Sequence, residues 1–191
     1  MSNYFSYFPT TEHDLTGDGD TVTVTNILKR FAFRKSNIDT LDIFSDFDIS
    51  EGDRPDIIAE KYYNDSRYAW IVLIFNNIVD PFYEWPLFGE NFRNYLVAKY
   101  GSIEAAHQTT KKYYRILYQG FKKIDGTVVP VKKLEIDLTT YNSLGSSEKS
   151  TQTAYEWEDE QNNNRMHIRL LDAKYLKRVL EEAESVLRTS S

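Results

Sequence analysis

The sequence contains no cysteine, which excludes disulfide bonds, thiolate catalysis and cysteine-ligated zinc, and which fits a reducing cytoplasm. No run of about 18 apolar residues occurs, so we expect no membrane-spanning helix and no membrane partner. The opening stretch MSNYFSYFPTTEHDL has no basic region and no apolar region of the kind that secretory signals carry, so we do not predict such a signal there.

Positive charge is also scarce. The 23 Lys and Arg residues are outnumbered by 29 Asp and Glu residues, and the net charge of −6 lacks the electrostatic footprint of general nucleic-acid binding. The three histidines are widely spaced and none lies in a metal-binding pattern, and there is no nucleophile elbow, P-loop or dinucleotide fingerprint. We therefore expect no enzyme activity, no cofactor and no metal site.

Two acidic stretches could suggest chemistry and have simpler interpretations. Asp18 and Asp20 resemble the start of a calcium loop, but the later ligands are missing, so a turn is expected. Glu156, Glu158 and Glu160 could hold an acid–base pair. On an alternating strand, however, they would share one face and form a solvated strand edge.

Aromatic residues are abundant, with 14 Tyr and 11 Phe, and tyrosine is favoured where protein surfaces meet. The first nine residues already carry four of them, Tyr4, Phe5, Tyr7 and Phe8. This segment either packs on its own domain or docks on a partner as an arm. On the second interpretation, deleting residues 1–9 would leave the thermal transition nearly unchanged and abolish assembly.

The first half of the chain predicts strands followed by two helices. Strands are expected at 21–25 and 40–50, and residues 26–36 as strand or irregular chain. Asp53 and Pro55 predict a helix to about residue 63, and a second, nearly all-apolar helix at 67–75 should be the most buried element, with the core around Trp70, Leu73 and Ile74. Asn76 and Asn77 fit its C-terminal end.

The second half predicts further mixed structure. Helices are expected at 89–102 and from 103, followed by strands over 113–137 with an Asp125–Gly126 hairpin turn. Residues 143–153 are predicted as a polar linker or flexible loop, and 154–172 as two alternating runs around a turn at 162–164. An amphipathic helix at 173–188 ends the chain.

The order strand, GD, helix, ND, helix, NNIVDP over residues 40–81 resembles a LysM module, a βααβ unit that binds N-acetylglucosamine polymers. Where that family closes its second strand, this sequence reads FYEWPLFGENF and enters a helix. Because the closing pattern is replaced, we expect sugar-polymer binding to be lost or unused.

Several pieces together resemble the T-even-type phage baseplate wedge protein 53 family. They are SYFP near the start, VTNILKRFAFR at 24–34, EGDRPDIIAEKYY with YAWIVLIFNNIVDPFYEWPL, KYGSIEAA, and AYEWEDEQNNNRMHIRLLDAKYL. The resemblance implies a non-enzymatic structural subunit of the virion's contractile tail, made and assembled in the host cytoplasm. It also implies several copies around the baseplate, in contact with wedge, hub or sheath-proximal proteins and helping to join wedges into a ring. The alternative is a peptidoglycan- or chitin-binding LysM module of a cell-wall protein.

Together these observations predict an α+β fold. It comprises an N-terminal arm and strand region (1–39), a LysM-like βαα(β) core (40–100) and a C-terminal α+β extension with a β-hairpin and a terminal helix (101–191). Two prolines, Pro81 and Pro86, bracket an aromatic loop whose side chains exceed what so small a core can bury. The predicted protein-interface residues are Tyr4, Phe5, Tyr7, Phe8, Phe82, Tyr83 and Trp85.

Overall fold

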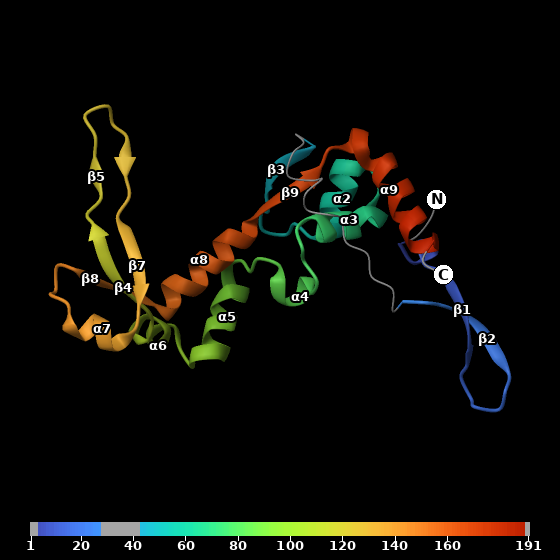
Figure 1. Cartoon of the computed structure of the whole chain (residues 1–191), viewed down its shortest axis with the longest axis horizontal. Helices are drawn as coiled ribbons and strands as arrows, with labels where there is room; N and C mark the ends of the chain where they lie inside the picture. The colour runs from blue at the N-terminus through green and yellow to red at the C-terminus, as the bar shows by residue number, and fades with distance from the viewer. Residues whose placement is uncertain (1–3, 28–42, 190–191) are drawn as a thin grey trace. The chain divides into compact units, whose positions relative to one another are not determined.

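The computed structural model describes residues 4–27 and 43–189 and has the expected α+β composition (Figure 1). It divides into two compact units, Met1–Trp85 with Met166–Ser191, and Pro86–Arg165. These units do not follow the predicted segments 1–39, 40–100 and 101–191, because the chain returns to the first unit after residue 165. Most of the predicted 26–36 segment, and the start of the strand predicted at 40–50, lie outside the described residues.

The first unit is built around two separate strand pairs with helices. Its elements are η1 (Tyr4–Tyr7), β1 (Thr10–Asp14), β2 (Thr21–Thr25), β3 (Phe44–Asp48), α2 (Pro55–Tyr63), η2 (Ser66–Tyr68), α3 (Ala69–Phe75), α4 (Pro81–Glu84), β9 (His167–Leu171) and α9 (Ala173–Thr189). Strands β1 and β2 pair antiparallel from Thr10 opposite Thr25. Strand β3 pairs antiparallel with β9, Phe44 opposite Leu171, so the partner of this strand comes from far along the chain.

Helix α2 forms where the sequence predicts it, with one change at its start. Arg54, rather than Asp53, occupies the cap position, and Pro55 begins the helix without losing a needed hydrogen bond. The Asp53 carboxylate instead accepts from the Ser50 amide at 3.0 Å and from Lys61 Nζ at 2.9 Å. Asn64, in the left-handed conformation, ends the helix.

Helix α3 carries much of the first core, but the buried positions differ from those predicted. Ile71, Val72 and Phe75 are buried, whereas Trp70, Leu73 and Ile74, around which the core was predicted, are only partly buried. A helix with apolar residues on every side gives no periodic signal, so the sequence could not identify its inward face. The prediction placed the core on the wrong residues of the right helix.

The N-terminal aromatic segment packs on its own unit. Tyr7 and Phe8 are buried in a cluster with Leu187 of α9, and the partly buried side chains around them are Tyr4, Trp70 and Leu180. The ring centroids of Tyr4 and Trp70 lie 5.1 Å apart. The structure therefore contradicts the expectation that residues 1–9 are dispensable for folding.

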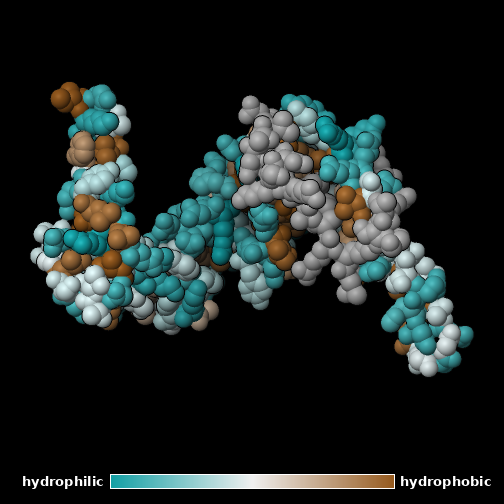
Figure 2. All heavy atoms as spheres, in the orientation of Figure 1, coloured by the Kyte–Doolittle hydropathy of each residue, from teal (hydrophilic) through white to brown (hydrophobic). Residues whose placement is uncertain are grey.

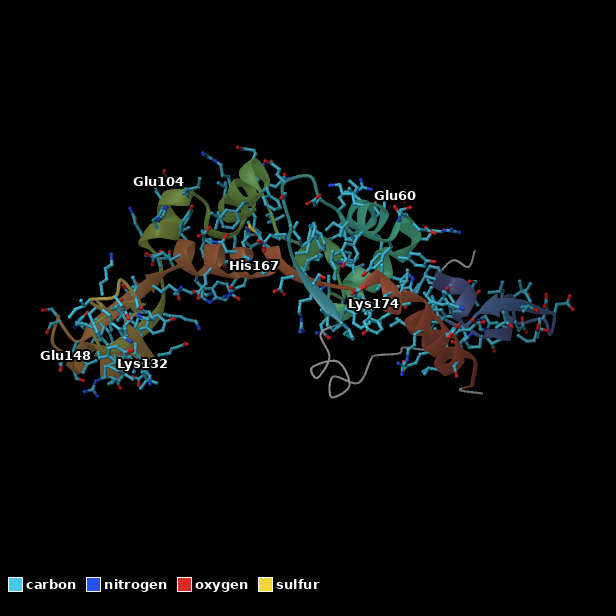
Figure 3. The ribbon with its side chains drawn as sticks, turned by 90° about the horizontal axis from the view of Figure 1, so that it is seen from above. Glu60, Glu104, Lys132, Glu148, His167 and Lys174 are labelled. Carbon is cyan, nitrogen blue, oxygen red and sulfur yellow. The ribbon has the colours of Figure 1, made fainter. Side chains whose placement is uncertain are left out.

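Strand β9 is held against α3 as well as β3. The Asn76 side chain donates to the Arg169 carbonyl at 2.8 Å and accepts from the Arg169 amide at 2.9 Å, as a neighbouring strand would. Ile168, Leu170 and Leu171 are buried, and Figure 3 labels His167 at the start of the strand. The two hydrogen bonds to β9 therefore hold Asn76, the first residue of the segment that leads to α4, in place.

The second unit contains a three-stranded antiparallel sheet in the order β7-β4-β8. Its elements are α5 (Gly89–Tyr100), α6 (Ile103–Gln108), β4 (Thr110–Tyr118), β5 (Phe121–Lys122), β6 (Val128–Val129), β7 (Lys132–Ile136), α7 (Leu138–Ser143), β8 (Lys149–Thr153) and α8 (Ala154–Met166). Ser102 caps α6, where the sequence predicts a new helix from residue 103, and the Asp125–Gly126 turn closes a hairpin as predicted.

Two predictions for this unit are wrong. The stretch predicted as a polar linker contains β8, which is held by backbone pairing to β4 rather than by apolar side chains. Residues 154–166, predicted as a strand and a turn, form helix α8. Its buried positions, Ala154, Glu158 and Asn162, recur every four residues, which is a helical spacing carried partly by polar side chains.

Glu158 is therefore not at a solvated strand edge but is the buried centre of a partly exposed polar network. Its carboxylate accepts from Tyr100 Oη at 2.6 Å and Tyr95 Oη at 3.0 Å, and lies 2.7 Å from Lys99 Nζ. Burial raises the pKa of Glu158, but the hydrogen bonds from Lys99, Tyr100 and Tyr95 outweigh it and leave the pKa below the ordinary value. Burial and, to a smaller extent, the hydrogen bond to Glu158 raise the pKa of Tyr100 to about 12.

This network predicts that the second unit loses stability in acid. The folded pKa of Glu158 lies below its ordinary value of 4.5, so its stabilisation is complete above pH 4.5 and is lost as the pH falls through the folded pKa. At pH 7, Glu158→Gln should lower the free energy of unfolding by about 2 kcal/mol, less than for a wholly buried pair because Lys99 is 40% exposed.

Urea unfolding from pH 7 down to pH values below 4.5, followed through the emission of Trp157, measures this difference. The two proteins should converge as the pH falls, because a protonated glutamic acid and a glutamine at this position are both uncharged. A difference that stays constant with pH would contradict the assignment, and Glu104→Gln, an exposed change in the same unit, is the control.

Candidate protein-interaction surface

The segment that joins α3 to α4 has a tightly bonded backbone. Asn77 takes the left-handed conformation with φ 55°, as its place after the helix predicts. The Asp80 carboxylate caps α4 by accepting from the Phe82 amide at 3.0 Å. The Glu84 carboxylate accepts from the amides of Val79 at 2.6 Å and Asp80 at 2.8 Å. Hydrogen bonds from both sides therefore fix the short helix.

Trp85 attaches the end of this segment to the first unit. Its indole Nε1 donates to the Asp53 carbonyl at 3.0 Å, and the ring is partly buried. Trp85 was predicted as an interface residue together with Phe82 and Tyr83. Its contacts show an anchoring role for the loop.

The apolar side chains of the segment point away from the unit. Val79 is 82% exposed, Phe82 89% and Tyr83 79%. We refer to these three side chains as the α4 surface. Aromatic groups exposed on a constrained backbone lose little conformational entropy on docking, which suits them to protein recognition.

The four N-terminal aromatic residues divide into two kinds. Tyr7 and Phe8 are buried within the chain, and Tyr4 is partly buried, with its pKa raised by that burial. Phe5 alone among them is largely exposed, at 57%. The structure thus removes Tyr7 and Phe8 from the accessible surface and leaves Phe5 as a contact candidate.

The other stretches considered for chemistry have structural roles. Asp14 accepts from the backbone amides of Thr16, Gly17 and Gly19, which closes the turn predicted at GDGD, and these bonds lower the pKa of Asp14. Within residues 4–27 and 43–189, no three His, Asp or Glu side chains are placed to share a metal ion. No helix in the same ranges has the length and apolar character needed to cross a membrane.

Comparison with known families agrees with the sequence resemblance. The family model described as base plate wedge protein 53 matches residues 3–125, well over half of the chain. The chain belongs to the base plate wedge protein 53 family. A search of curated proteins finds no match. As a wedge protein 53 family member it is a structural protein of the phage tail baseplate, and the α4 surface lies within the matched residues.

Sequence reasoning missed one exposed apolar region of this wedge family member. Phe121, Ile124 and Val128 lie on β5, β6 and the turn between them, and all three are more than half exposed. The sequence predicted the hairpin but not its exposure. The available signal was the run of lysines beside these apolar residues, which is unusual for a hairpin that packs against its own domain.

Proposed function

We propose that this protein binds neighbouring wedge proteins through the α4 surface and thereby helps to join wedges into a closed baseplate ring. The observation that carries the proposal is the family match over residues 3–125, which includes this surface. Partners are expected among the other wedge, hub or sheath-proximal tail proteins, with several copies of the chain around the baseplate and assembly in the host cytoplasm.

The geometry of the α4 surface supports a binding role over a catalytic one. Its exposed groups are two aromatic rings and a valine, none of which is an acid, base or nucleophile suited to hydrolysis. The nearby carboxylates of Asp80 and Glu84 are occupied by backbone amides. A small number of aromatic anchors dominates the binding energy of typical protein interfaces.

Replacing Phe82 and Tyr83 together with alanine tests this proposal. The change should weaken incorporation into wedges by about 2–3 kcal/mol, the range of interface hot spots, because both rings would be buried by the partner. Circular dichroism and the thermal transition should be unchanged, since neither ring is buried in the free chain. Incorporation is measured as the midpoint of a titration of the chain into tail particles that lack it.

The matched control is Leu138→Ala together with Val186→Ala, two exposed apolar side chains outside the α4 surface. Normal incorporation of the Phe82/Tyr83 variant would contradict the proposal. Saturable binding of the parent to insoluble peptidoglycan, in competition with chitin oligomers, would instead favour the LysM alternative.

A further inference from the structure

The second unit carries an arm formed by the outer part of the β4–β7 hairpin. Past the last residue of β4 that pairs with β8, residues 117–131 run from the end of β4 through the short β5–β6 pair and the turn at Gly126 to the start of β7 (Figure 1). Gly120 permits the two strands to stay close here, because a Cβ atom at this position would lie 2.7 Å from the Val129 carbonyl oxygen. We refer to residues 117–131 as the hairpin arm.

The arm exposes apolar side chains along its length. Ile124 is fully exposed beside the turn, and Figure 2 shows hydrophobic residues at the tip and along the strands. The other exposed apolar side chains of the arm are Leu117, Tyr118, Phe121, Val128 and Val131. An exposed apolar stripe on a two-stranded ribbon is unfavourable in water, and such a ribbon is only marginally stable by itself. These side chains are suited to burial by another molecule.

Positive charge accompanies the apolar stripe. The arm itself carries Lys122, Lys123 and one acidic residue, Asp125, and the strand residues at its base, 111–116 and 132–133, add five basic residues and no acidic one. Of these five, Lys112 pairs with Glu135. Lys122, Lys123 and Lys132 make no ion pair within the described part of the chain, and Lys132 lies on β7 (Figure 3). Their charge is available to a partner of opposite sign.

We propose that the hairpin arm inserts its tip into an apolar hollow, edged by carboxylates, on another protein of the baseplate. Specific protein interfaces place apolar anchors at the centre and charges at the rim, and the complementary charges guide association. A nucleic acid is disfavoured as the occupant, because Ile124 at the tip offers no partner to phosphates and Asp125 beside it would repel them.

This inference rests on the proposed function, which places the partner in the baseplate. It concerns a surface separate from the α4 surface. A photo-crosslinking amino acid at position 124 tests it in assembled tail particles, with a second crosslinker at position 83 in a separate chain. We expect the residue at 124 to crosslink to a tail protein other than this chain, at a peptide that contains several Asp or Glu residues.

Charge reversal then tests the chemistry of the partner. Lys122→Glu with Lys123→Glu should reduce the crosslink yield at 124 about tenfold or more, because like charges would face one another at the rim. The matched control is Lys177→Glu with Arg178→Glu, an equal reversal at exposed positions of α9. It also removes the solvent-exposed ion pair of Lys177 with Glu181, and it should leave the yield unchanged. The thermal transition of both variants should equal that of the parent.

The remaining outcomes separate the two proposals. Absence of the labelled chain from particles contradicts the proposed function. Particles that contain the chain but give no crosslink at 124 overturn the hairpin inference, as does a crosslink to nucleic acid or to a second copy of this chain, identified by mixed isotopic labelling. An unchanged yield in the Lys122/Lys123 variant also overturns it.

Discussion

Replacing Phe8 with alanine is expected to lower the free energy of unfolding of the first unit by about 3–5 kcal/mol, the usual cost of removing a buried phenylalanine. Phe8 is 8% exposed and shares a cluster with Tyr7 and Leu187. Its ring centroid lies 5.0 Å from that of Tyr4 in an edge-on arrangement. Alanine would leave a cavity between the N-terminal segment and α9 and weaken both.

Phe5→Ala is the matched control, because it removes the same side chain three residues earlier in the same segment. Phe5 is 57% exposed, and its loss should cost less than about 1 kcal/mol. Urea unfolding of both variants in a Trp157→Phe background makes Trp70 and Trp85, both in the first unit, the reporters. Equal midpoints for the two variants would show that the segment does not belong to the core.

Replacing Ile71 with alanine is expected to destabilise the first unit by about 3–4 kcal/mol, whereas Ile74→Ala in the same helix should cost about half as much. Ile71 has no exposed surface, and Ile74 is partly buried. The lost transfer energy and the residual cavity both increase with burial. The substitution that destabilises the unit more therefore identifies the face of α3 that points into the core.

The same fluorescence-detected urea unfolding measures the Ile71 and Ile74 variants, and the two substitutions delete identical atoms. A larger effect for Ile74→Ala than for Ile71→Ala would support the core predicted from sequence, around Trp70, Leu73 and Ile74. That result would contradict the packing seen in the structure.

The elements that the sequence predicts well carry local signals. Pro55 marks the start of α2, Ser102 the cap of α6, and the Asp125–Gly126 pair the hairpin turn. Each depends on a residue's own backbone preference or on a hydrogen bond within three residues, so the local sequence contains the information.

The failures occur where distant partners decide the structure. Residues 154–166 alternate in polarity like a strand, yet Glu158 and Asn162 are buried because α5 residues and the Leu87 backbone supply their hydrogen bonds. Strand β8 has polar residues typical of a linker and pairs with β4 through its backbone. Neither partner can be identified from the residues nearby.

The candidate site was predicted in part. Phe82 and Tyr83 were selected because the prolines restrict their backbone, and they prove to be exposed. The same reasoning selected Trp85, and the concentration of aromatic residues in the first nine positions selected Tyr7 and Phe8. These three side chains contact their own unit. Composition identifies aromatic residues beyond the needs of a small core, but only the packing shows which of them remain at the surface.

The pairing of β3 with β9 has a consequence for synthesis. Phe44 lies opposite Leu171, and the Asn76 side chain bonds to Arg169, so both contacts wait until residues 169–171 have been synthesised. The second unit is continuous in sequence and can fold while the chain is still on the ribosome. A chain that stops before β9 lacks both contacts, so the pairing of β3 and the bond from the end of α3 cannot form until the whole second unit has been synthesised.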